Sequence, residues 1–254
     1  MKKKTVTAVA CCVAVVIVCA LIGFIASKGA KDGYASETLS NPTMSQGLSA
    51  SEKITDATVT QYVETPHYEY ASFNGTAFLG NSRFVSLKDY NLAPNVYPVV
   101  GLDVRTVFTK YVTNSNVVVI DELDGREFDK VILMFGDNEC GWPNRDYFID
   151  KYKQVIDAVK KKQPDAQIYL HAIIPVSAET SDRNECDCNN ITIHELNVRI
   201  RQLADDCDVN YIDVPSCLLD YEGNLISEAS KDGVHLNKKY STLWMAYLEQ
   251  FMFK

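Results

Sequence analysis

The sequence has no basic tract longer than three residues, which narrows the class of macromolecule expected as a partner. Its 254 residues include 33 acidic and 25 basic side chains, for a net charge of −8. Proteins that bind nucleic acid usually present a patch or stripe of Lys and Arg to the phosphates. Nucleic acid is therefore not an expected partner, and the acidic balance mainly indicates solubility.

A regular cysteine framework is missing as well. Three of the eight cysteines fall within the first 26 residues, and the other five are Cys140, Cys186, Cys188, Cys207 and Cys217. An odd number cannot all pair within one chain, and the spacings match no usual disulfide pattern. Cys186 and Cys188, with His194 nearby, lack the second pair of ligands that a structural zinc site needs. A loop disulfide or plain thiols are expected, with no metal or other cofactor.

Residues 27–72 lack hydrophobic periodicity, and the whole chain lacks internal repeats. This stretch is rich in Ser, Thr, Ala, Gly and Lys, with one candidate strand at 59–63. Such a composition is typical of a solvated linker. The pattern changes at residue 73, so the sequence predicts an extracytoplasmic linker over 27–72 and a folded domain over 73–254.

The first 26 residues contain the longest apolar run. Lys2 to Lys4 precede 22 residues without a charge, 5–26, which as a helix would span roughly 33 Å, enough to cross the hydrocarbon layer. A cleaved signal peptide is the alternative, but its apolar region is usually about 7–15 residues long and no clean cleavage site is present. We favour a transmembrane signal-anchor over 1–26, with the lysines in the cytoplasm and the rest of the chain outside. Cleavage would instead give a secreted protein.

After residue 73, short apolar runs alternate with amphipathic stretches. Five strands are predicted, at 77–79, 96–100, 131–135, 168–174 and 211–214. Apolar residues at helical spacing predict helices over 148–159, 193–207 and 240–251. Lys160 to Lys162 and Pro164 end the first helix, and Thr192 with Glu195 has the spacing of a capping box at the start of the second. The alternation favours an α/β fold in which helices cover both faces of a mostly parallel sheet.

Residues suited to acyl transfer follow the predicted strands. Ser82 comes after the first strand, Gly101 after the second and Asn138 after the third. The loop before the last helix carries Asp232 and His235. Because the carboxyl ends of parallel strands share one edge of a sheet, these side chains are expected to converge there.

This set contains the groups that a serine hydrolase mechanism needs. His235 can take the proton of the Ser82 hydroxyl, and Asp232 can hold the imidazole in one tautomer. The backbone N–H groups of Ser82 and Gly101 and the side-chain amide of Asn138 are candidate oxyanion donors, each worth roughly 3 kcal/mol.

In these blocks the chain resembles the SGNH (GDSL-like) hydrolases, which are named for a Ser, a Gly, an Asn and a His. The matching residues are Ser82 in Gly-Asn-Ser-Arg, Gly101, Asn138 in Gly-Asp-Asn-Glu, and His235 with Asp232 three positions earlier. The resemblance covers about residues 74–251. It implies a flavodoxin-like three-layer α/β/α sandwich, here with five strands, and an ester-cleaving serine mechanism without a metal.

Two positions depart from the pattern of the family. Asn81 stands where an aspartate usually precedes the nucleophile, and Asp137 stands where a neutral residue more often precedes the asparagine. Neither departure removes a catalytic group. Residues beside the catalytic blocks are expected to bind substrate, and they are Asn81, Arg83, Asp137, Glu139 and Trp142.

Other interpretations fit the residues less well. The Gly-x-Ser-x-Gly elbow of α/β-hydrolases would need a glycine where Phe84 lies. The remaining histidines, His67, His171 and His194, are expected to be structural. We therefore predict a membrane-tethered, extracytoplasmic serine esterase that removes small acyl groups, acetyl above all, from carbohydrate. The alternatives are an O-acyltransferase that uses the same site and a catalytically inactive, glycan-binding module.

Overall fold

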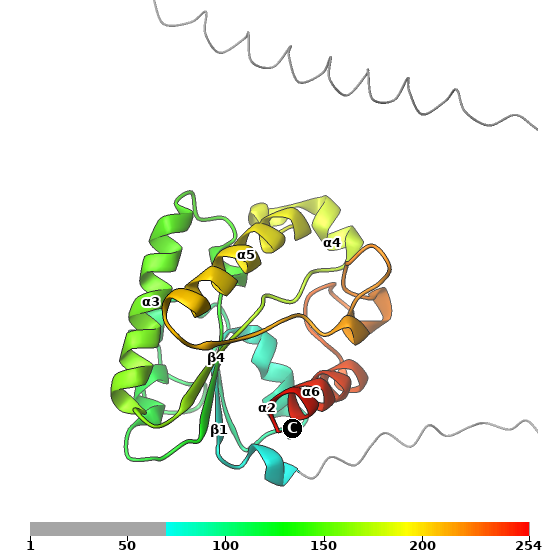
Figure 1. Ribbon diagram of the computed structural model, residues 1–254. Coiled ribbons are helices and arrows are strands. Elements are labelled where there is room, and N and C mark those ends of the chain that lie inside the picture. The colour runs from blue at the N-terminus through cyan, green and yellow to red at the C-terminus, as the bar shows by residue number, and fades with distance from the viewer. Residues whose placement is uncertain (1–69, 254) are drawn as a thin grey trace, which may run out of the picture. The chain divides into compact units, whose positions relative to one another are not determined.

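The computed structural model describes residues 70–253 (Figure 1). The predicted membrane segment at 1–26, the candidate strand at 59–63 and His67 lie outside these residues. Within 70–253, none of the helices combines the length and the apolar character that a membrane crossing requires.

A five-stranded parallel sheet forms the centre of this part of the chain, as predicted. Its strands are β1 (Thr76–Gly80), β2 (Asn95–Pro98), β3 (Lys130–Met134), β4 (Gln167–His171) and β5 (Asn210–Ile212). The order across the sheet is β2-β1-β3-β4-β5, and every neighbouring pair is parallel. All carboxyl ends therefore lie along one edge, which is where ligands bind in open α/β sheets.

Helices follow β1, β3, β4 and β5 along the chain. They are α2 (Val85–Asp89), α3 (Arg145–Lys162), α4 (Ala178–Arg183), α5 (Asn190–Asp206) and α6 (Lys238–Met252). Short 3₁₀ turns lie between them: η1 (Tyr70–Phe73), η2 (Ser82–Phe84), η3 (Thr106–Phe108), η4 (Val119–Leu123), η5 (Asp137–Glu139), η6 (Glu185–Asp187), η7 (Ser216–Leu218) and η8 (Ser227–Ala229).

The two faces of the sheet are covered by different helices, which gives three layers (Figure 1). Alternate side chains of β1 point to opposite faces, as the pleat requires. Ala77 and Leu79 belong to the core beneath α3 and α5, whereas Phe78 belongs to the core beneath α2 and α6. Both cores are fully buried at their centres; Phe148 on α3 and Trp244 on α6 have no exposed surface.

Several predicted element ends differ from the structure, and two of these differences have a clear local cause. The predicted strand 168–174 ends as β4 at His171, because Asn197 on α5 takes both backbone groups of Ile173: its Oδ1 accepts from the N–H at 2.7 Å and its Nδ2 donates to the carbonyl at 2.9 Å. Helix α5 begins before the predicted capping box, because Asn189 is its N-cap and accepts a 2.9 Å bond from the N–H of Thr192. Both side chains are polar groups that substitute for regular backbone pairing.

His171 is structural, as expected. The ring is fully buried, and its Nε2 accepts a 2.8 Å hydrogen bond from Nε1 of Trp244. Its Nδ1 lies 2.6 Å from the carbonyl oxygen of Ala172, which fixes the proton on Nδ1. Burial lowers the pKa of His171 to about 4. The pair joins β4 to α6, the helix that directly follows the loop of His235.

Candidate active site

Ser82 lies on a sharp turn that begins at the end of β1. A Cβ on Gly80 would lie 2.8 Å from the carbonyl oxygen of Met134 and 2.8 Å from the ring of Phe84, so this position accepts only glycine without rearrangement. Asn81 then caps η2, its Oδ1 accepting a 3.0 Å bond from the N–H of Arg83. The turn leaves Ser82 half-buried at the carboxyl edge of the sheet.

His235 is positioned by the loop between η8 and α6. Oδ1 of Asp232 accepts hydrogen bonds from the backbone N–H groups of Val234 (2.9 Å) and His235 (2.8 Å) and from the Ser230 hydroxyl (2.9 Å). Gly233 supports this turn with φ +79°, and a Cβ there would lie 2.0 Å from Oγ1 of Thr180. The loop is therefore fixed before any substrate is present.

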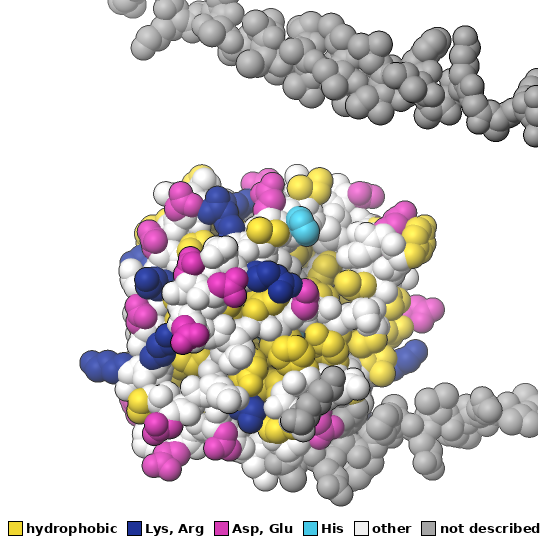
Figure 2. Space-filling view, viewed as in Figure 1, with side chains coloured by type: hydrophobic (Ala, Val, Ile, Leu, Met, Phe, Trp, Pro, Cys, Tyr) yellow, Lys and Arg dark blue, Asp and Glu magenta, His cyan; other side chains and the backbone are white. Residues whose placement is uncertain are grey.

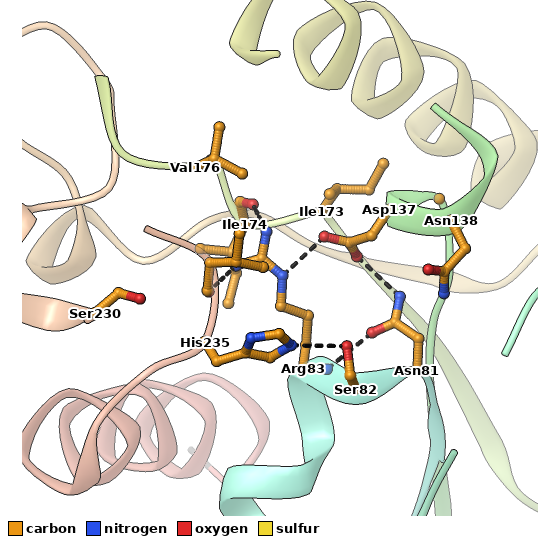
Figure 3. A network of polar contacts seen from close by, with 12 residues as sticks. Asn81, Ser82, Arg83, Asp137, Asn138, Ile173, Ile174, Val176, Ser230 and His235 are labelled. Carbon is orange, nitrogen blue, oxygen red and sulfur yellow. Dashed lines mark hydrogen bonds and ion pairs between the residues drawn. The ribbon is translucent and has the colours of Figure 1, made fainter. Parts of the chain in front are cut away.

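The two segments meet through a hydrogen bond between His235 and Ser82 (Figure 3). Nε2 of His235 lies 2.8 Å from Oγ of Ser82, and Nδ1 of the same ring lies 2.7 Å from Oδ2 of Asp232. A carboxylate only accepts, so Nδ1 carries the proton and Nε2 accepts from the Ser82 hydroxyl. This is the tautomer in which an imidazole can act as a base toward a serine.

The charge of Asp232 suits this arrangement. Burial would raise its pKa, but hydrogen bonds from the imidazole and backbone of His235 outweigh that effect and hold the pKa well below its usual range. The carboxylate is therefore ionised at any pH near neutrality. Both side chains are open to solvent, with 45% of His235 and 56% of Asp232 exposed.

Gly101 and Asn138 lie on neighbouring loops at the same edge. Asn138 is exposed, and its Nδ2 donates a 2.7 Å bond to the carbonyl of Leu102, next to Gly101. An amide nitrogen has two N–H groups, and this bond uses one of them. Gly101 has φ +68°, and Nζ of Lys110 donates to its carbonyl at 2.7 Å. The predicted oxyanion donors are thus on loops that are bonded to each other.

Three residues expected to bind substrate are buried instead. Asn81, Arg83 and Glu139 have 1%, 3% and 0% of their surface exposed. Oε1 of Glu139 accepts from the N–H of Val104 and Oε2 from that of Gly136, both at 2.9 Å, so this side chain joins two loops and faces no cleft. Burial raises the pKa of Glu139 to about 8, against the opposing effect of these N–H donors.

The other two expected substrate contacts remain partly accessible. Asp137 keeps 12% of its side chain exposed while it pairs with Arg83. Trp142 is half-buried against the core beneath α3 and α5, with the guanidinium of Arg105 at 4.1 Å from its ring centroid. Arg105 and Ser230 were not predicted from the sequence. For Ser230 a signal exists, because the Ser-x-Asp spacing of 230–232 places a hydroxyl within reach of the Asp232 carboxylate.

One cavity lies beside Asp232, and another lies among residues that were not predicted for the site. One of about 610 Å³ is lined in part by Asp232, Ser230 and Thr180, and neither Ser82 nor His235 lines it. Another, of about 890 Å³, lies between α5 and the segment after β5 and contains none of the predicted site residues. Volume alone therefore does not identify the site, whereas the hydrogen-bond chain does.

Comparisons with known proteins agree with this architecture. A sequence model of the GDSL-like lipase/acylhydrolase family matches residues 97–240, a segment that contains Gly101, Asn138, Asp232 and His235 and begins after Ser82. No curated protein matches the chain.

Two solved structures illustrate the likeness in fold. One is a GDSL-like lipase from Bacteroides thetaiotaomicron, 18% identical with a TM-score of 0.53; the match covers 69% of this chain and 86% of that one. The other is a Streptococcus pneumonia protein that carries the name platelet activating factor, 21% identical with a TM-score of 0.56, covering 70% and 83%. At such identities the likeness shows the fold alone.

Proposed function

The chain belongs to the GDSL-like lipase/acylhydrolase family, whose members act on ester bonds, and we propose that it is a serine esterase that removes small acyl groups, acetyl above all, from carbohydrate outside the cell membrane. One observation carries the proposal: the imidazole of His235 lies within hydrogen-bonding distance of both Ser82 Oγ, at 2.8 Å, and Asp232 Oδ2, at 2.7 Å. A serine is a weak nucleophile until a neighbouring base can take its proton.

In the proposed reaction Oγ of Ser82 attacks the ester carbonyl carbon while its proton passes to Nε2 of His235. The imidazolium then gives this proton to the leaving oxygen, the alcohol departs, and Ser82 carries the acyl group. Water, deprotonated by His235, attacks the acyl-enzyme, and the acid leaves as Ser82 regains its proton. The ionised Asp232 stabilises the imidazolium in both halves.

The oxyanion of each tetrahedral intermediate needs donors that are already in place. We assign this role to the backbone N–H groups of Ser82 and Gly101 and to the second N–H of the Asn138 amide. The bond from Asn138 to the Leu102 carbonyl holds the amide against the Gly101 loop, so little reorganisation is needed when the charge develops.

The substrate class follows from the surroundings of the nucleophile and from the N-terminal sequence. The exposure of His235 and Asp232 leaves room for a large, hydrated leaving group such as a glycan. The apolar stretch 5–26 behind three lysines supports a signal-anchor that tethers the domain outside the membrane. Acetylated glycans are abundant esters in that location.

Turnover by the purified full chain in detergent tests the proposal. We expect hydrolysis of p-nitrophenyl acetate and release of acetate from an acetylated polysaccharide, with both activities reduced to background by Ser82→Ala and by His235→Ala. Ser216→Ala and His194→Ala are matched controls at exposed positions and should keep wild-type rates.

The same assay separates this function from its alternatives. Unchanged turnover in Ser82→Ala would exclude the serine mechanism. Glycan binding without turnover would indicate a binding module, and acetyl transfer to an added sugar that is faster than hydrolysis would indicate an O-acyltransferase.

A further inference from the structure

Arg83, the residue after the candidate nucleophile, carries a buried guanidinium that contacts the other loops of the site. Its side chain is 1% exposed. Nε donates to Oδ1 of Asp137 at 2.8 Å, and one terminal nitrogen donates to the carbonyl of Ile174 at 3.0 Å. The other terminal nitrogen donates to the carbonyl of Val234. Figure 3 shows these contacts radiating from the guanidinium.

Two of the three partners of Arg83 directly precede a residue that is used in the proposed reaction. Val234 precedes His235, and Asp137 precedes Asn138, the candidate oxyanion donor. Ile174 lies three residues beyond the end of β4, and in the sequence it falls between Asp137 and Val234. One side chain thus bonds the serine turn to the base loop and to the oxyanion loop at the same time.

Only an arginine fits this set of contacts. The guanidinium is planar and presents five N–H groups in fixed directions, whereas a lysine is a single rotatable point charge. A buried cation also needs a paired anion, because an unpaired charge in the interior is strongly destabilising. Asp137 supplies that anion, and its Oδ2 accepts a further 2.9 Å bond from Nδ2 of Asn81.

We propose that Arg83 is a positioning residue that sets the Ser82–His235 distance and the placement of Asn138, with Asp137 as its counter-ion and Asn81 as the bridge back to the serine turn. This inference rests on the proposed function of the same site. Arg83 does not contact substrate; it acts through the three loops that it joins.

The hydrogen-bond pattern provides a strict test, because Asn81 and Asp137 can exchange side-chain types without losing a hydrogen bond, while the carboxylate moves from position 137 to position 81 of the same cluster. An Asn at 137 can accept from Arg83 Nε and donate to position 81. An Asp at 81 can accept that bond and still accept from the N–H of Arg83, as Asn81 does now. Either single change instead sets two carboxylates or two amides against each other.

The experiment measures kcat and KM of the full chain for p-nitrophenyl acetate in Asn81→Asp, Asp137→Asn and the double exchange, and in Arg83→Lys. We expect each single variant to lose at least about tenfold in kcat with KM within about threefold of wild type, and the double exchange to return kcat to within about threefold. Arg201→Lys is the matched control, since this half-exposed arginine pairs with Asp213 away from the site and should keep the wild-type kcat.

A spectroscopic measurement keeps this inference separate from the proposed function. The ¹⁵N shifts of the His235 imidazole report its hydrogen bond to Ser82 whether or not the protein turns over. Asp137→Asn should move them toward those of Ser82→Ala, and the double exchange should restore them. Three results would overturn the inference. They are a double exchange whose kcat falls by the combined factors of the two single variants, wild-type ¹⁵N shifts in Asp137→Asn, and a wild-type kcat in Arg83→Lys. Absent turnover with this pattern of shifts would overturn only the proposed function.

Discussion

Asp232 has two tasks that a single carboxylate performs with different oxygens. Oδ1 closes the loop by accepting from Ser230, Val234 and His235, and Oδ2 faces the imidazole at 2.7 Å. The shape of the loop and the tautomer of His235 are therefore set by one side chain, and a substitution that preserves the first task can still abolish the second.

Asp232→Asn makes that separation. An Asn Oδ1 can still accept the three loop bonds, but its Nδ2 would face Nδ1 of His235 as a second donor. The ring would then carry its proton on Nε2 and donate to Ser82, which removes the base. We expect kcat for p-nitrophenyl acetate to fall about 10³- to 10⁴-fold with little change in thermal stability.

Asp220→Asn is the matched control for a carboxylate that only accepts backbone hydrogen bonds in a turn. Asp220 also accepts backbone N–H bonds from Glu222 and Asn224 in a short turn, but no imidazole faces it. This variant should keep the wild-type kcat. Equal kcat in Asp232→Asn and wild type would contradict the assigned role of Asp232.

At the residue scale, the sequence predicted which groups lie together at the edge of the sheet but not which way each side chain faces. Ser82, His235 and Asp232 could be selected because each follows a predicted strand or precedes a predicted helix. Arg83 and Glu139 were assigned to substrate because they flank those blocks, yet both are buried and bonded to backbone groups. Their partners, such as Ile174 and Val104, are distant in sequence, so no local pattern indicates them.

The turns after the strands are the elements that bring the site together. Gly101 ends the segment after β2 in a left-handed conformation, with φ +68°. A Cβ there would meet only Nζ of Lys110, at 3.6 Å, so the space beside it is open. In the proposed mechanism the backbone N–H of this residue approaches the oxyanion, and a side chain would occupy part of that space.

Gly101→Ala tests this turn against a glycine with the same φ. Gly125 also has φ +68°, and a Cβ there would meet nothing within 4 Å. Both substitutions should cost about 1 kcal/mol of unfolding free energy, the usual penalty of a left-handed residue with a Cβ. Only Gly101→Ala should lower kcat/KM, by tenfold or more. Equal kcat/KM in the two variants would show that the oxyanion does not approach Gly101.

At the element scale, the sequence predicted the five strands and the candidate site residues that follow them, but not the residue at which each strand ends. Alternating apolar runs are local and were sufficient to find all five strands. The end of β4 depends on Asn197, a side chain on α5 that folds back onto Ile173. Such a contact exists only after the helix has packed on the sheet, which is why periodicity cannot reveal it.

For the described domain as a whole, the His171–Trp244 pair joins the sheet to α6 in a fully buried core. The ring is neutral in the folded protein, because burial lowers its pKa to about 4. An unfolded chain restores the ordinary value near 6.5. Above pH 6.5 both states are neutral and the group has no effect on stability. Below it the unfolded state binds the proton first, so stability falls until the pH passes the folded pKa.

Urea unfolding at several pH values checks this effect. Between pH 7.5 and pH 4 the wild type should lose about 3 kcal/mol of unfolding free energy through His171, beyond what its carboxylates contribute. His171→Gln has no proton to gain, so the difference in stability between the two proteins should shrink by that amount as the pH falls. A difference that stays constant across this range would contradict a neutral, buried His171.

The reactivity of Ser82 toward a fluorophosphonate tests the central claim most directly, because the probe needs an activated serine and no knowledge of the substrate. Intact-protein and peptide mass spectrometry should find one adduct, on Ser82, in the wild-type chain. The adduct should be absent in Ser82→Ala and should form at least about 100-fold more slowly in His235→Ala. A folded wild-type protein that remains unlabelled at Ser82, or equal labelling rates with and without His235, would contradict the account.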